Sequence, residues 1–563
     1  MILNLSVYTI LFLLITVEFL VLAILVPRQS ENVFRSIERA LAKLATRQSI
    51  GTWLLFFWVI LVRLAILPLL PVPIPGVHDE FSYLLMADTF AHGRLANPPH
   101  PMWISFETFH VNWQPTYSSM YPPAQGFVLA LGQWLGHPWI GVLLCASAMC
   151  AATHWMLRAW LPARWAFLGG VLAALKFGIA SYWINSYWGG AVAAIGGALV
   201  LGALPRIARE PSAREALMLG LGVALLANSR PYEGFLFCIP AGLWFLWWLA
   251  GKVNLRTATR DRLVRIVVPL GTILLLTVAF MAYYNWRLTG SPLLFPHRLN
   301  TRTYESAALF LWQHPREQLH YHNEQFEDFY NNWEPNYYNN SWRDVWKVTA
   351  QKFTLCGSTY FWWGALLLLP ALPWVFFDRK LRLPLAAFLF VVAGFLVVIW
   401  SGPHYVAPVT CVIILFLVQA IRHLRTIRFR GRPVGAALAR AAVVLLLVDC
   451  VSAAAQRSCD PVYWTCTGDP SRVAVIEKLS RFPGKHLVVV RYQEEDHNLH
   501  DDWVFNGAEI DSARILWARD TTAEQNASLL AYFKDRQIWL IEPDQDNTKL
   551  MPYPLSPSSP DDQ

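Results

Sequence analysis

Long apolar runs are the feature that most constrains the fold of this chain. Hydrophobic residues make up 55% of its 563 residues and charged residues only 15%, against about 25% charged residues in a soluble domain. A run of about 20 apolar residues can cross a bilayer as one helix, and the pattern predicts an all-α polytopic membrane bundle. We expect about twelve spans, at 5–26, 52–72, 139–158, 164–183, 190–205, 215–229, 231–250, 264–286, 356–377, 383–401, 404–422 and 438–456.

The charged residues mark the loops between these runs. The formal net charge of +8 could indicate nucleic-acid binding, but the Lys and Arg residues do not form one basic face. The densest basic run extends from Arg422 to Arg440. Because short cytoplasmic loops of membrane proteins are rich in Lys and Arg, we place this run in the cytoplasm, where it can contact lipid headgroups.

The segment Tyr121–Gly136 could be a further span, and the positive charges decide against it. Only about 14 residues follow its two prolines, fewer than a typical span needs. If it crossed, Arg206, Arg209 and Arg214 would lie outside, against the positive-inside rule. We therefore interpret residues 73–138 as one external loop with helices that lie in the membrane interface.

The composition divides the chain into three parts. Residues 1–51 are expected to form an extra N-terminal transmembrane anchor and a cytoplasmic amphipathic helix, because the first run has no basic leader and no cleavage site. Residues 52–456 would form the main transmembrane domain, with external loops at 73–138 and 287–355. Residues 457–563 would form a small external domain.

The tail differs from the rest of the chain because charged residues occur throughout it. Helix-like segments at 471–482 and 522–536 alternate with strand-like segments at 486–492, 513–518 and 537–544. Such alternation predicts a parallel α/β domain. The Pro- and Ser-rich end from residue 552 is expected to be disordered.

Eight cysteines are too few for a disulfide scaffold. Most lie in apolar runs and are expected to be small core residues. Cys459 and Cys466 flank a polar turn after the last run. They form a candidate disulfide if that region lies outside the cytoplasm.

An unusual group of ionisable residues follows the second run. The segment 76–95, GVHDEFSYLLMADTFAHGRL, contains the pair Asp79 and Glu80. A carboxylate held at the membrane surface could accept a proton from an incoming hydroxyl group. The alternative is that the pair only solvates a loop. The other charged residues of this segment are weaker candidates, expected to hold the loop in shape: His78, Asp88, His92 and Arg94.

Cationic and aromatic residues are expected at the external ends of several spans. Arg230 and Arg287, with His404 and Tyr405, could bind a phosphate, since guanidinium groups form forked hydrogen bonds with phosphate. The alternative for each Arg is a side chain that reaches from the membrane to the interface. Lys176 lies inside a span and should have a partner, because an intramembrane Lys costs roughly 3 kcal/mol.

The segment INSYWGG begins at residue 184 and places polar and aromatic side chains in an external turn. Aromatic rings there could stack on a sugar, although an interfacial aromatic belt is the simpler interpretation. The candidate substrate-binding residues are Tyr121, Asn185, Tyr187, Trp188 and Glu233.

A metal site is not expected. The loop from 314 to 328 contains possible ligands, but their spacing is loose and the loop is polar throughout. These residues are His314, His320, His322, Glu324, Glu327 and Asp328.

Three short motifs of this chain have counterparts at similar positions in a known protein family. They are HDEFSY at 78–83, SMYPP at 119–123 and SRPYEG at 229–234. With the span and long external loop around them, they resemble the C-type (GT-C) membrane glycosyltransferases, in the branch that contains protein O-mannosyltransferases and the lipid A aminoarabinose transferase. The resemblance covers about residues 52–425.

The resemblance implies a catalytic domain that takes a sugar from a polyprenyl-phosphate donor, with inversion and without a metal cofactor. Asp79 matches the presumed base, Glu80 its neighbour, and Arg230 a basic residue near the donor phosphate. The implied location is a bacterial inner membrane, with the site and the tail on the periplasmic side. The extra N-terminal span and the tail depart from the family, so the acceptor (lipid, glycan or protein) stays open.

Two other functions fit the same residues. A transporter or flippase for a lipid-linked saccharide would use the phosphate-binding residues without a base, but such proteins often contain internal repeats, and none is visible. A non-catalytic membrane scaffold would use the tail to bind a partner or a glycan.

The topology makes one direct prediction. In a variant without its native cysteines, single cysteines near residues 430 and 530 should be labelled by an impermeant thiol reagent from opposite sides of the membrane, because an odd number of crossings separates them. Labelling of both from the same side would contradict the topology.

Overall fold

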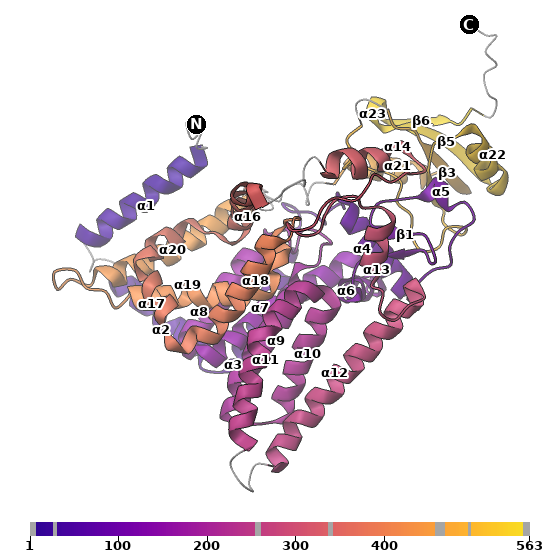
Figure 1. The fold of residues 1–563 in the computed structure, drawn as a ribbon. Coiled ribbons are helices and arrows are strands. Elements are labelled where there is room, and N and C mark those ends of the chain that lie inside the picture. Colours follow the sequence, from indigo (N-terminus) through magenta and orange to yellow (C-terminus); the bar gives the residue numbers. More distant parts are fainter. Residues whose placement is uncertain are drawn as a thin grey trace.

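The computed structural model describes residues 7–25, 31–253, 260–335, 342–455, 468–493 and 497–554. Helices form the body of the molecule, and a small sheet lies at the C-terminal end of the chain (Figure 1). The all-α bundle with a small α/β domain is therefore confirmed. Cys459 and Cys466 lie outside the described residues, as does the chain from residue 555.

Seven helices of the described part are long and apolar enough to cross a membrane, or up to eight if the bent pair Phe34–Ala45 and Ser49–Ala65 is one span. They lie within α7 (Pro138–Trp160), α9 (Gly190–Arg209), α11 (Pro231–Val253), α12 (Arg260–Thr289), η4 with α18 (Arg379–Leu381, Arg382–Val397), η5 with α19 (Pro403–Val409, Thr410–Leu424) and α20 (Val434–Ala455).

The other five expected runs are also helical. Among them, α8 and α10 have 15 and 17 residues, so each is short for a bilayer of about 30 Å. The five are α1 (Val7–Leu25), α3 (Gln48–Ala65), α8 (Ala163–Phe177), α10 (Ala213–Ser229) and the broken helix of η3 and α17 (Trp363–Ala371, Leu372–Phe377). The expected amphipathic helix is α2 (Glu31–Ala45).

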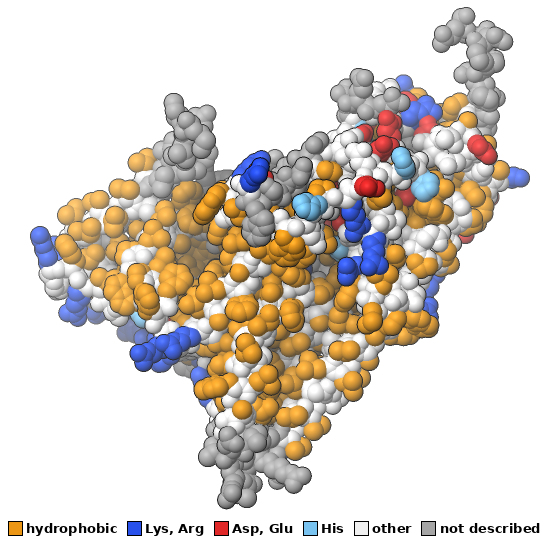
Figure 2. Space-filling view, in the orientation of Figure 1, with side chains coloured by type: hydrophobic (Ala, Val, Ile, Leu, Met, Phe, Trp, Pro, Cys, Tyr) orange, Lys and Arg blue, Asp and Glu red, His pale blue; other side chains and the backbone are white. Residues whose placement is uncertain are grey.

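Small residues allow the central helices to pack closely. A Cβ atom added at Gly222 of α10 would lie 2.8 Å from the Gly196 carbonyl oxygen of α9. Such close approach of backbones is typical of helix pairs in membranes. By contrast, α12 exposes large apolar side chains such as Leu275 and Leu276. Hydrophobic side chains cover the face of the helices seen in Figure 2, as expected for a surface in contact with lipid.

The first external loop is folded rather than open. It contains α4 (His78–Ala91), α5 (Trp103–Phe106), the antiparallel pair β1 (Val111–Asn112) and β2 (Ser118–Ser119), and α6 (Pro123–Trp134). With 12 residues, α6 is about 18 Å long. It is too short to cross the bilayer, in agreement with the interfacial interpretation of Tyr121–Gly136.

The second external region contains short helical pieces separated by irregular chain. In order, these are α13 (Pro296–Thr303), α14 (Glu324–Glu327), the π-helical turn η1 (Asp328–Trp333), η2 (Trp342–Asp344) and α16 (Val345–Tyr360).

The C-terminal domain is a four-stranded sheet in the order β4-β3-β5-β6. The first three strands are parallel, as predicted, and β6 is an antiparallel edge strand that the sequence analysis missed. The elements are α21 (Pro470–Leu479), β3 (Lys485–Val490), β4 (Ile515–Arg519), α22 (Ala523–Tyr532), β5 (Arg536–Glu542), α23 (Pro543–Asp546) and β6 (Asn547–Pro552).

The C-terminal domain packs along α4. The Phe505 ring stacks on the Phe81 ring with centroids 3.8 Å apart, and the Ala508 backbone N–H donates to the Asp88 carboxylate at 2.7 Å. Arg94, near the end of α4, forms an ion pair with Glu509. Asp88 and Arg94 therefore hold the loop in shape, as expected, and they do so by binding the C-terminal domain.

A buried arginine completes this interface. Arg519 is 1% exposed, forms an ion pair with Asp502, and donates from Nε to the Glu107 carbonyl oxygen at 2.8 Å. Its guanidinium group also lies 5.9 Å from the Phe109 ring and 5.5 Å from the Phe326 ring. One cation thus contacts both external loops and the C-terminal domain.

Candidate functional site

Asp79 lies in the first turn of α4, where the helix N-terminus favours a carboxylate. One carboxylate oxygen accepts a hydrogen bond from the Tyr121 hydroxyl, and the other lies 3.9 Å from His110 Nε2. The side chain is 16% exposed. Asp79 is therefore held from two sides and still accessible.

Glu80 lies on the opposite side of the same turn and is completely buried. Its carboxylate accepts backbone N–H bonds from Tyr187 at 2.8 Å, Gly76 at 2.9 Å and Val77 at 3.2 Å. Burial raises the pKa of Glu80 to about 8, although the three N–H donors favour the charged form. The predicted acidic pair is thus divided, since Glu80 holds the loop and Asp79 alone is accessible.

Tyr83 connects Asp79 with the cationic residues. Its ring stacks on the Tyr121 ring with centroids 4.5 Å apart. Burial raises the pKa of the Tyr83 hydroxyl, the nearby Arg230 guanidinium lowers it, and the Asp79 carboxylate raises it. The hydroxyl therefore lies within the electrostatic reach of both Asp79 and Arg230, although 151 positions separate them in the chain.

Arg230 ends α10 and faces the beginning of α11. Its Nη1 atom lies 4.0 Å from Glu233 Oε1, and its guanidinium group lies 4.8 Å from the Tyr405 ring centroid. The His404 ring adjoins the Tyr405 ring at 4.9 Å and the Trp188 ring at 4.6 Å. The structure thus brings four other predicted residues together around the Arg230 guanidinium group.

Three other predicted residues lie elsewhere or have structural contacts. Arg287 is exposed at the end of α12, and in the described part of the chain no hydrogen bond or ion pair connects it to Arg230 or Asp79. Tyr187 donates from its hydroxyl to the Pro73 carbonyl oxygen at 3.0 Å. Asn185 binds a buried cation, Arg63.

Arg63 is a residue that the sequence analysis missed. Its side chain is completely buried in α3. It donates to Asn185 Oδ1 at 2.8 Å, to the Leu70 carbonyl oxygen at 2.7 Å and to the Pro71 carbonyl oxygen at 3.0 Å. A buried charge persists only when it is paired or hydrogen-bonded, so Arg63 anchors the chain that leads into the external loop.

Lys176 has the partners that its position within a span requires. Its ammonium group donates to the Phe361 carbonyl oxygen at 3.4 Å and lies 5.9 Å from the Trp362 ring centroid. These contacts explain how α8 tolerates the charge.

Three histidines lie near Asp79: His78, a weaker candidate of the sequence analysis, and His110 and His500, which that analysis did not select. His110 has a backbone φ of 60°, which is uncommon for a residue other than glycine. The His78 ring lies 5.9 Å from the His110 ring and 6.2 Å from the ring of His500, which comes from the C-terminal domain. Burial lowers the pKa of His78, His110 and His500, so neutral imidazoles line this side of the site.

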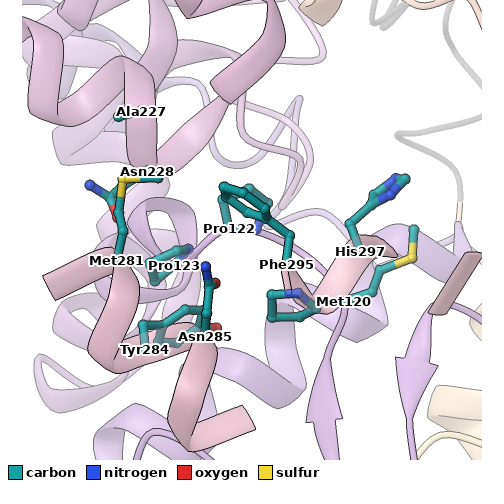
Figure 3. Close-up of a pocket in the computed structure, with 11 residues that line it drawn as sticks. Met120, Pro122, Pro123, Ala227, Asn228, Met281, Tyr284, Asn285, Phe295 and His297 are labelled. Carbon is teal, nitrogen blue, oxygen red and sulfur yellow. The ribbon is translucent and has the colours of Figure 1, made fainter. Parts of the chain in front are cut away.

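A mostly apolar pocket adjoins this group. It lies where the YPP segment meets the ends of α10 and α12 and the start of α13 (Figure 3). Its wall includes His297, whose pKa is lowered to about 4 by burial, His110 and Arg230 and is raised by Asp79. The pocket is therefore next to the charged groups. Its lining is Met120, Pro122, Pro123, Ala227, Asn228, Met281, Tyr284, Asn285, Phe295, Pro296 and His297.

The His-rich loop has a different arrangement. His322 Nδ1 lies 3.7 Å from the buried Glu107 carboxylate, whereas His314 and His320 are exposed. Within the described residues, no group of three or more His, Cys, Asp or Glu side chains could hold a metal ion.

Comparison with known proteins gives structural matches only. No family model and no curated protein matches the chain. The fold is similar to ArnT from Cupriavidus metallidurans in the apo state, with a TM-score of 0.46 and 13% identity over 86% of this chain and 92% of that one. It is also similar to the archaeal oligosaccharyltransferase AglB from Archaeoglobus fulgidus in complex with an inhibitory peptide and a dolichol-phosphate, with a TM-score of 0.43 and 12% identity over 87% and 70% of the two chains.

Identities of 12–13% and TM-scores below 0.5 do not assign a function to this chain.

The contacts of Glu80 predict the effect of Glu80→Gln. The variant would place an amide NH₂ against backbone N–H donors, and an unmet buried group costs about 1–3 kcal/mol. We expect a lower thermal unfolding midpoint in detergent, whereas Glu317→Gln at an exposed position should leave it unchanged. A Glu80→Gln protein as stable as the wild type would contradict the structural role of Glu80.

Proposed function

We propose that the protein is a membrane glycosyltransferase that transfers a sugar from a polyprenyl-phosphate donor to an acceptor hydroxyl group at the external face of the membrane. The observation that carries this proposal is the meeting of one carboxylate, Asp79, and one guanidinium group, Arg230, around Tyr83, both with side chains that are mostly but not fully buried. A carboxylate base can activate a nucleophile, and a cation in the same site can stabilise an anionic leaving group.

Asp79 is the proposed general base. As the acceptor oxygen bonds to the anomeric carbon, its proton passes to the Asp79 carboxylate, and the bond between the anomeric carbon and the phosphate oxygen breaks. Attack from the face opposite the phosphate inverts the anomeric carbon. The Tyr121 hydroxyl donates a hydrogen bond to one carboxylate oxygen of Asp79, and His110 lies beside the other. These two groups fix the orientation of the Asp79 side chain.

Arg230 is the proposed phosphate ligand. Its present partner, Glu233, is 4.0 Å away, and its guanidinium group packs over Tyr405. A forked hydrogen-bond donor suits a phosphate, and the departing phosphate gains negative charge during the reaction. Because Arg230 supplies the compensating positive charge, we propose a reaction without a metal cofactor. His404 and Trp188 would form the adjacent wall.

Arg287 is not part of the proposed phosphate site. We propose that the apolar side chains lining the pocket beside Tyr121 and Arg230 contact the non-polar part of a lipid substrate. The distribution of basic residues over the loops supports a site on the external side, which would be the periplasmic side in a bacterial inner membrane. A flippase for a lipid-linked saccharide is the second candidate, because it would use the same cation, but it would not need Asp79.

The Asp79→Asn variant tests the base. We expect about a 10²–10⁴-fold lower turnover, measured with purified protein and a panel of polyprenyl-phosphate sugars, with an unchanged thermal unfolding midpoint. Asp535→Asn, at a 63% exposed side chain, is the matched control. Wild-type turnover in Asp79→Asn would exclude Asp79 as the base, and intact lipid translocation without transfer would favour the flippase.

The Arg230→Lys and Arg230→Gln variants test the phosphate ligand. Loss of the forked donor should weaken binding of polyprenyl phosphate about ten-fold or more, with Gln weaker than Lys because it also removes the charge. Binding can be measured by ligand-dependent thermal stabilisation. Asp79→Asn should retain this binding. Equal affinity in all four proteins would show that the phosphate binds elsewhere.

A further inference from the structure

The second external region contains two buried carboxyl groups outside the Asp79 site. Glu305 is 4% exposed and Glu334 is 1% exposed. Glu305 follows α13, and Glu334 follows the π-helical turn η1. Acidic side chains are rarely buried to this extent unless they are paired or bind a cation.

Backbone and ring contacts bring the two segments together. The Ser306 hydroxyl donates to the Tyr330 carbonyl oxygen, and the Tyr304 ring stacks on the Tyr330 ring with centroids 6.0 Å apart. Glu334 follows the π-helical turn that contains Tyr330. Burial and the charge of Glu334 raise the pKa of the Tyr330 hydroxyl, so the two side chains are neighbours. Burial and the charge of Glu305 raise the pKa of Glu334 to about 9, as expected for neighbouring carboxyl groups.

Among the described residues, several buried polar atoms at this place lack a hydrogen-bond partner of good geometry. They are both carboxylate oxygens of Glu334, one oxygen of Glu305 and the Tyr330 hydroxyl. Against the effects of burial and Glu305, the Ala307 backbone N–H acts on Glu334 and lowers its pKa. Tyr330 is 0% exposed. The nearby cation, Arg316, donates to the Thr301 carbonyl oxygen. Since each unmet buried group costs about 1–3 kcal/mol, a group of four favours a ligand in addition to the contacts that the described part of the chain supplies.

We propose that Glu305, Glu334 and the Tyr330 hydroxyl bind a hard divalent cation, with Ca²⁺ as the preferred ion. Two carboxylates balance its charge, and all three side chains offer oxygen, the donor that Ca²⁺ and Mg²⁺ prefer. Backbone carbonyl oxygens and water would supply the other ligands. Ca²⁺ is preferred because it accepts irregular geometry and gives up water more readily than Mg²⁺. The histidines of the 314–328 loop take no part.

The ion would fix the part of the second external region that lies beside the Asp79 site. Tyr330 belongs to an aromatic cluster with Phe109, Tyr304, Phe326 and Phe329, and the Phe329 ring lies 5.6 Å from the His78 ring beside Asp79. A cation that ties Glu305 to Glu334 would fix this cluster. The proposed role is structural and does not depend on the reaction at Asp79.

Binding can be measured without any substrate. The full-length protein in detergent is stripped with chelator and titrated with Ca²⁺, Mg²⁺ or Zn²⁺, and the bound metal and the thermal unfolding midpoint are followed. We expect one Ca²⁺ per chain and a rise of the midpoint by a few degrees, with weaker responses to Mg²⁺ and Zn²⁺. Glu305→Gln and Glu334→Gln should lose the ion and the rise, whereas Glu317→Gln should keep both.

A second result would overturn the proposal. If the two carboxyl groups share a proton instead, the stripped wild type will bind no divalent cation, and Glu334→Gln will be as stable as the wild type or more stable in the presence of chelator. A Ca²⁺ response that survives in both Glu305→Gln and Glu334→Gln would also contradict this site. Neither result depends on whether Asp79 is a base.

Discussion

The buried carboxylate of Glu80 is the contact on which the site depends. It joins the end of the chain leaving α3, the first turn of α4 and the turn before α9 through three backbone N–H groups. This fixes the start of α4, so that the preceding residue, Asp79, faces Tyr121 and His110. The buried Arg63 holds the segment that leaves α3 through the Leu70 and Pro71 carbonyl oxygens, and it binds Asn185 in the turn before α9. A few buried, hydrogen-bonded polar side chains, Glu80 and Arg63 among them, thus give the apolar bundle one well-ordered polar end.

The C-terminal domain extends this arrangement on the other side of α4. Arg519 contacts the two external loops and its own domain, and Phe505 stacks on Phe81 two residues after Asp79. His500 brings the same domain to His78. The domain therefore forms part of the wall around the proposed site, and its removal would expose the apolar side of α4. Asp88 in α4 and Arg94 just after it bind Ala508 and Glu509 of the C-terminal domain, so these charged residues belong to the same interface.

Local patterns predicted much of the fold and part of the site. Apolar run length predicted the helices, and alternation of helix and strand predicted β3, β4, β5 and their parallel order. Asp79 and Arg230 stood out because charge beside a span is costly. Glu80 was selected only as the neighbour of Asp79, and its own structural role was missed, since adjacent residues in a sequence do not reveal which faces inward. Tyr83, His110 and Arg63 acquire their roles from contacts with distant parts of the chain, and no spacing pattern encodes these contacts. Arg287 shared the sequence context of Arg230 but points to the surface.

The central claim is that one site holds the donor phosphate on Arg230 with Asp79 directed at the sugar. An experimental structure of the protein with bound polyprenyl phosphate tests this claim most directly. The account predicts the phosphate within hydrogen-bond distance of the Arg230 guanidinium group, the first part of the lipid in the pocket lined by Pro122 and Phe295, and Asp79 open toward the phosphate. A phosphate bound at another place, with Arg230 still packed between Glu233 and Tyr405, would contradict it.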